Sequence, residues 1–211
     1  MALNKLKFNS INVTPAASKA IRFNSSANGL ETADAGGNLV KIATTTASSS
    51  ASLSFTSGID STYKEYMFFF NNLHPQTDDT KLVFQTTTDG SNFNTTLTNT
   101  YFVARNQEDN SSRALGYSAD DDQAQGTAFQ RLNESTGSDN DQSISGHMHL
   151  FEPSSTTFVK HYISRTMTIF DRATDVFGAG FFNTTSAITG IQFKMSSGNI
   201  DSGTITMYGV R

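Results

Sequence analysis

Apolar and polar residues alternate with the period of β-strands along much of the chain. In the run ATTTASSSASLSFTS (residues 43–57), Ala51, Leu53 and Phe55 alternate with serines. A period of two is typical of a strand with one buried face. We therefore expect a strand from about Ser50, and we interpret the low-complexity residues before it as linker-like.

The segment KEYMFFFNNL (residues 64–73) contains five consecutive large apolar residues, from Tyr66 to Phe70. The run is too short and too aromatic for a typical helix, and it suits a strand that is covered on both faces. The pattern predicts a central strand of a sheet.

Asp89 and Gly90 lie between two threonine-rich runs in the segment KLVFQTTTDGSNFNTTL (residues 81–97). Glycine tolerates the positive φ of a tight turn, so the pattern predicts a β-hairpin here. A further strand is expected in TYFVAR (residues 100–105).

The polar stretch 106–140 predicts long loops around short strands, because only a few apolar fragments such as residues 115–117 interrupt it. Apolar segments bounded by Gly, Pro, Asn or Asp then return at 143–153, 157–170, 176–184, 188–197 and 204–211. The spacing predicts about eight to eleven strands. We expect an all-β fold, an antiparallel β-sandwich of jelly-roll-like form.

The first third of the chain differs from the rest, since its short apolar pieces are separated by polar and small residues. We expect residues 1–45 to form an extended N-terminal arm, or short strands, that docks elsewhere, and residues 46–211 to form the sandwich. A chain of 211 residues is long enough to bury a core without disulfides, and it contains no cysteine.

Composition excludes several functions. The net charge of −4 argues against nucleic-acid binding, which needs clustered cations. No stretch approaches the roughly 18 apolar residues of a membrane span, so no membrane insertion is expected. The first ten residues lack the apolar core of a signal peptide, so we expect the chain to be made in the cytoplasm.

Few residues suggest catalysis. The chain has no glycine-rich nucleotide loop and no G-x-S-x-G motif, so we expect no cofactor and no enzymatic activity. His147 and His149 would lie on one face of a strand, and with His161 on the next strand they could hold a transition metal. The alternative is that they are polar residues of a half-exposed strand, since no carboxylate at close spacing completes a site. His74 is interpreted as structural or solvated.

Acidic residues gather at 120–122 and at Asp139 and Asp141, but neither group has the spacing of a known calcium loop. Solvated loop carboxylates are the alternative. The chain has 17 Phe, 6 Tyr and no Trp, a set that favours core and interface over a sugar-stacking platform.

Three segments, at 50–79, 149–164 and 191–211, resemble small virion proteins of tailed bacteriophages that infect marine bacteria and cyanobacteria. The resemblance implies a fibre, tail-associated or capsid-decorating protein that is assembled in the host cytoplasm, released by lysis and located in the virion. It implies no functional residue. By the same resemblance, residues 11–37 are the part that grips a neighbouring virion protein.

We therefore expect a structural protein that forms a homo-oligomer, a trimer above all, and attaches to the capsid or tail. The alternative is a carbohydrate-binding module that recognises a host-surface glycan through the loops at 106–140. A third interpretation is a metal-dependent enzyme of cupin-like form built on His147, His149 and His161.

Overall fold

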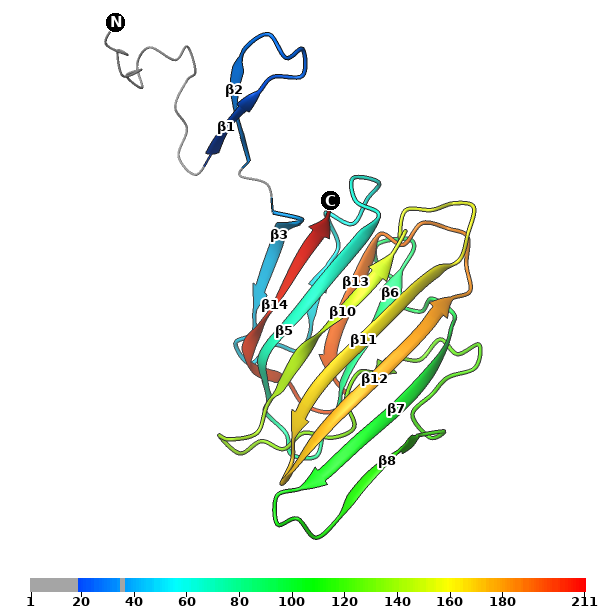
Figure 1. Cartoon of the computed structure of the whole chain (residues 1–211). Coiled ribbons are helices and arrows are strands. Elements are labelled where there is room, and N and C mark those ends of the chain that lie inside the picture. Colours follow the sequence, from blue (N-terminus) through cyan, green and yellow to red (C-terminus); the bar gives the residue numbers. More distant parts are fainter. Residues whose placement is uncertain (1–18, 35–36) are drawn as a thin grey trace, which may run out of the picture. The chain divides into compact units, whose positions relative to one another are not determined.

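The computed structural model describes residues 19–34 and 37–211, and within them the chain is all-β, with fourteen strands and no helix (Figure 1). All the strand pairs of these residues are antiparallel. The predicted fold class is confirmed. Its basis is the abundance of threonine and aromatic residues, which pack well on a pleated surface.

The chain divides into two units, residues 1–38 and residues 39–211. The described part of the first unit is a hairpin of β1 (Lys19–Phe23) and β2 (Leu30–Asp34). Its turn is closed by the Asn24 backbone N–H, which donates to the Gly29 carbonyl. Residues 1–18 of the predicted arm lie outside the described residues.

The second unit contains two sheets. The large sheet has eight strands in the order β3-β14-β5-β10-β11-β12-β7-β8. In that order they are β3 (Leu39–Thr46), β14 (Ile200–Val210), β5 (Glu65–Pro75), β10 (Ile144–Phe151), β11 (Lys160–Ile169), β12 (Arg172–Phe182), β7 (Leu97–Gln107) and β8 (Arg113–Tyr117). This sheet faces the viewer in Figure 1.

The small sheet has four strands in the order β4-β13-β6-β9 and lies behind the large one (Figure 1). Its strands are β4 (Leu53–Phe55), β13 (Gly190–Met195), β6 (Leu82–Thr87) and β9 (Gln130–Arg131). The sandwich is therefore uneven, whereas a jelly roll divides its eight strands between two sheets.

Aromatic side chains from both sheets meet in the core. The Phe193 ring on β13 lies 5.3 Å from Phe70 and 5.6 Å from Phe68, both on β5, measured between ring centroids. On the small-sheet side it lies 6.4 Å from Phe55 and 6.3 Å from Phe84. Such pairs contribute about 0.5–1.5 kcal/mol beyond the area they bury. The central position predicted for residues 64–73 is confirmed, since β5 pairs with β14 on one side and with β10 on the other.

The start of the sandwich differs from the prediction. Residues 43–46 are not linker but the second half of β3, which pairs with β14 from Leu39↔Val210 to Thr46↔Thr204. The compact unit accordingly begins at Leu39 and not at residue 46. Threonine is a good strand former, and the backbone ladder to β14 orders this low-complexity run.

The predicted hairpin at Asp89-Gly90 is a turn, but β6 and β7 do not pair. Gly90 has a φ of 82°, and the Asp89 carboxylate accepts hydrogen bonds from the backbone N–H groups of Ser91 and Asn92. After this turn the chain crosses between sheets, because β6 pairs with β13 and β9 whereas β7 pairs with β12 and β8. The prediction of pairing was wrong.

Candidate assembly interface

The face of the large sheet that points away from the small sheet, here called the outer face, carries exposed hydrophobic side chains. Leu115 is 79% exposed and Phe177 is 41% exposed. The other large members of this set are Phe102, Tyr117, Ile163 and Met167. The solvated face of an antiparallel sheet is ordinarily polar, so this face departs from the usual pattern.

The exposed residues follow from the alternation of β11 and its neighbours. Along β11 every second residue is buried, so Ile163, Arg165 and Met167 point outward while Tyr162 points into the core. Because apolar residues occupy both faces of this strand, alternation alone does not reveal which set is covered. Burial of one face by the small sheet leaves the other set exposed.

One row of side chains crosses six strands of the outer face in register. The paired residues, from β5 to β8, are Phe69, His147, Arg165, Phe177, Phe102 and Tyr117. Directly opposed side chains on neighbouring strands interact. Accordingly the Phe102 and Tyr117 rings lie edge to face with centroids 5.4 Å apart.

The charges at the centre of this face are paired within it. Arg165 donates to the Asp175 carboxylate with Nε–Oδ1 and Nη2–Oδ2 distances of 3.1 and 2.7 Å, and its guanidinium lies 4.7 Å from the centroid of the Phe177 ring. Nδ1 of His149 contacts the Glu65 carboxylate. These two pairs compensate their own charges, and a paired charge costs less to cover than an unpaired one.

A hollow of about 380 Å³ interrupts the face between β7, β12 and β11. Small residues at Gly178, Ala179 and Thr100 adjoin it, and the side chains of Phe102 and Ile163 help to line it. The hollow has the size and apolar character of a socket for a large side chain.

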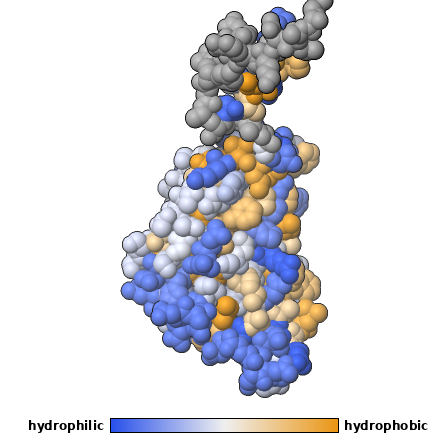
Figure 2. All heavy atoms as spheres, turned by 60° about the vertical axis from the view of Figure 1, so that its left-hand side comes forward, coloured by the Kyte–Doolittle hydropathy of each residue, from blue (hydrophilic) through white to orange (hydrophobic). Residues whose placement is uncertain are grey.

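In Figure 2 hydrophobic residues gather along the right-hand side of the sandwich, the side to which the front of Figure 1 has turned, while the opposite side is mostly white and blue. Contiguous apolar surface on a folded domain marks an interaction site.

His147 and His149 lie together on β10, with ring centroids 5.3 Å apart. Burial, with His149 and Arg165 nearby, lowers the pKa of His147. His161 on β11 pairs instead with Phe151. In residues 19–34 and 37–211, no three His, Asp or Glu side chains come together so as to hold a metal ion.

Two carboxylates of the predicted acidic groups contact side chains of neighbouring strands. Asp121 contacts Arg131 and Asp122 accepts from the hydroxyl of Tyr117. Nε2 of the His74 ring donates to the backbone carbonyl of Asp139, 3.1 Å away. The loops at 106–140 are present as predicted, apart from β8 and β9 and the end of β7.

The exposure of the outer face was not predicted from the sequence. Its signal was available in strands such as 160–169, where apolar residues occur at both odd and even positions. Within the described part of the chain, no helix is long and apolar enough to cross a membrane. Comparisons of the chain with protein-family models, with curated proteins and with solved structures found no match.

Proposed function

We propose that the chain is a structural protein of a bacteriophage virion, and that it assembles with copies of itself through the outer face of its large sheet. The observation that carries the proposal is the row of exposed aromatic residues on that face, centred on Phe102 and Phe177. A face rich in aromatic residues and an arginine, with few unpaired charges, has the composition of an interface core.

The occupant that fits this face best is another copy of it. Because Arg165 and Asp175 neutralise each other, the centre of the face carries no net charge that would favour an oppositely charged partner. It also presents both protruding side chains, such as Leu115, and a hollow that could receive one. Most soluble oligomers are symmetric assemblies of one chain, and we propose a trimer, in which one part of the face contacts a different part of the face on the next copy.

The resemblance noted above supports the place of the protein in a virion, on the capsid or tail, after synthesis in the host cytoplasm. In this role the chain needs no cofactor and catalyses no reaction. Its function is the geometry of its contacts with its own copies and with other virion proteins.

The first experiment measures the mass of the purified chain by light scattering. The wild type is expected to be an oligomer whose mass does not change with a chelator. Phe177→Asp is expected to give monomers, because it places a charge in the interface, and to unfold like the wild type because the residue is half exposed. The matched control is Phe158→Asp, a change at a residue that is 72% exposed in a loop. A monomeric wild type, or an oligomeric Phe177→Asp variant, would contradict assembly through this face.

A second experiment tests whether the chain is part of the virion. Mass spectrometry of purified virions of the virus that encodes the chain is expected to detect it in stoichiometric amount. Absence from the particle, with the chain present in the infected cell, would refute the structural role.

A further inference from the structure

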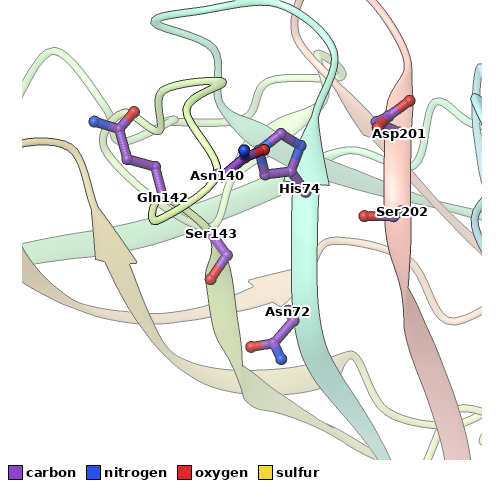
Figure 3. Close-up of a pocket in the computed structure, with 7 residues that line it drawn as sticks. All are labelled: Asn72, His74, Asn140, Gln142, Ser143, Asp201 and Ser202. Atoms are coloured by element: carbon purple, nitrogen blue, oxygen red, sulfur yellow. The ribbon is translucent and has the colours of Figure 1, made fainter.

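A polar pocket of about 380 Å³ lies at one end of the large sheet, where β5 and β14 meet the loop that leads into β10 (Figure 3). Its lining residues are Asn72, His74, Asn140, Gln142, Ser143, Asp201 and Ser202. The volume lies within the range of ligand pockets, roughly 300–1,000 Å³.

Backbone irregularities on both sides of β5 create the pocket. The pairing of β14 with β5 shifts register on each side of Ser202, and the pairing of β10 with β5 shifts between Ile144 and Gly146. Asn72 has a φ of 46° and Gly203 a φ of 104°. Bulges re-aim side chains that a regular strand would alternate between two faces. Here they bring Asn72 and Ser202 to the same hollow.

Several lining side chains have unused hydrogen-bonding atoms. In the described part of the chain, the side chains of Asn140, Ser143 and Ser202 make no hydrogen bond, although all three line the pocket. Asp201 accepts from the Ser49 hydroxyl through Oδ1, at 3.0 Å, which leaves Oδ2.

His74 adds a hydrogen-bond acceptor to the pocket, and Asn72 adds a donor. Because Nε2 of His74 faces the Asp139 carbonyl, it carries the proton, and Nδ1 is left as an acceptor. Oδ1 of Asn72 accepts from the Ser145 hydroxyl at 3.3 Å, so its amide N–H groups remain available. In Figure 3 the ring of His74 lies beside Asn140, and the hydroxyl of Ser202 points toward β5.

The chemistry of the lining selects the ligand class. Of the described residues that line the pocket, none is a lysine or arginine, so an anion has no counter-charge. Asp201 is the single carboxylate among them, too few for a calcium ion. None is apolar, which disfavours a lipid or an aromatic ring. Interleaved neutral donors and acceptors match groups that both donate and accept, as sugar hydroxyls do.

We propose that this pocket binds a neutral saccharide, through the hydroxyls of one or two sugar rings. The proposal goes beyond self-assembly, and it differs from the glycan site expected at 106–140, because only Asn140 of the lining falls in that stretch. Bonds to sugar hydroxyls replace bonds to water, so single-site affinity is weak and several copies in one oligomer would strengthen attachment.

The test uses the labelled full-length chain on an array of bacterial surface glycans, followed by titration with free glucose, galactose, mannose and N-acetylglucosamine. The pocket variant is Asn140→Ala with Ser202→Ala, since neither side chain contributes a hydrogen bond to the fold. The matched control is Asn94→Ala, at an exposed asparagine outside the pocket.

The expected result is a glycan signal in the wild type that Asn94→Ala retains and that the double variant loses by about tenfold or more. An equal signal in the double variant would overturn the proposal, and so would silence of the wild type on the array and in all four titrations. The Phe177→Asp variant separates the two proposals, because its isolated chain is expected to keep the affinity for free sugar even when assembly fails.

Discussion

At the scale of single residues, Tyr162 is a core position where a substitution is expected to maintain or raise the free energy of unfolding. The side chain is buried on β11, and its hydroxyl has no hydrogen-bond partner among the described residues. Burial raises the pKa of Tyr162 above its usual value of 10.0. An unpaired buried hydroxyl costs about 1–3 kcal/mol, so Tyr162→Phe is expected to be as stable as the wild type or more stable at pH 7.

The same substitution is expected to change the alkaline limb of the stability curve. The pKa of Tyr162 is higher in the folded protein than in the unfolded chain. The free energy of unfolding is therefore unaffected by the ionisation of this group below pH 10. It falls as the pH rises from 10 toward the folded pKa, because only the unfolded chain then ionises the hydroxyl. The variant lacks this group, so its advantage should grow above pH 10 by up to about 1.4 kcal/mol per pH unit. Urea unfolding at pH 7 and pH 11 measures both effects. A variant that is markedly less stable at pH 7 would mean that the hydroxyl has a partner after all.

The burial of Lys160 could not be predicted from the residue pattern. Lysines are almost never fully buried, yet this one is, with Nζ donating to the carbonyls of Thr184 and Ser186 at 3.2 and 2.6 Å. Burial lowers its pKa. The alternation of β11 places Lys160 on the same face as Tyr162, but only the position of the loop after β12 explains how its charge is satisfied.

At the scale of elements, strand positions were predictable and strand partners were not. The turn at Asp89-Gly90 follows from local chemistry, as the hydrogen bonds to the Asp89 carboxylate show. Whether the chain then pairs with the strand it has left depends on burial across the whole sandwich. Likewise the bulges beside Ser202 leave no sequence signal beyond Gly203, and so the polar pocket could not be foreseen.

A substitution at Gly203 tests the bulge beside Ser202. It has a φ of 104°, and a Cβ there would lie 2.4 Å from the backbone oxygen of Asn72. Gly203→Ala should therefore lose about 2 kcal/mol or more of unfolding free energy, since both the φ and the contact are unfavourable. Gly90→Ala is the matched control, with a φ of 82° and no atom near the added Cβ, and should lose about 1 kcal/mol. Chemical denaturation compares them, and equal losses would show that the close approach to Asn72 is relieved by relaxation.

At the scale of the whole molecule, the antiparallel sandwich was predictable from strand spacing, whereas the unequal sheets were not. Apolar residues on both faces of β11 are compatible with a central layer or with an exposed interface. The position of the small sheet decides between these, because it covers one face of the large sheet and no described strand covers the other. The proposed assembly surface thus follows from tertiary structure, although the residues that form it were visible in the sequence.

The boundary between the two units gives a prediction at this scale. A chain that begins at Leu39 keeps every strand of the sandwich, and its stability should match the full chain within about 0.5 kcal/mol. A chain that begins at residue 47 lacks β3, so β14 becomes an unprotected edge and Ile42 and Ala43 no longer pack on the core. That chain should lose about 3 kcal/mol or more and aggregate on heating.

Urea unfolding and light scattering of both truncated proteins measure these outcomes. If both match the full chain, β3 is dispensable and the boundary belongs at residue 46, as the low complexity of residues 43–49 suggests. If the chain that begins at Leu39 is itself unstable, the sandwich depends on residues 1–38. If it folds and forms oligomers but no longer enters virions, the two tasks separate, with self-assembly on the outer face and attachment to the particle in the N-terminal unit.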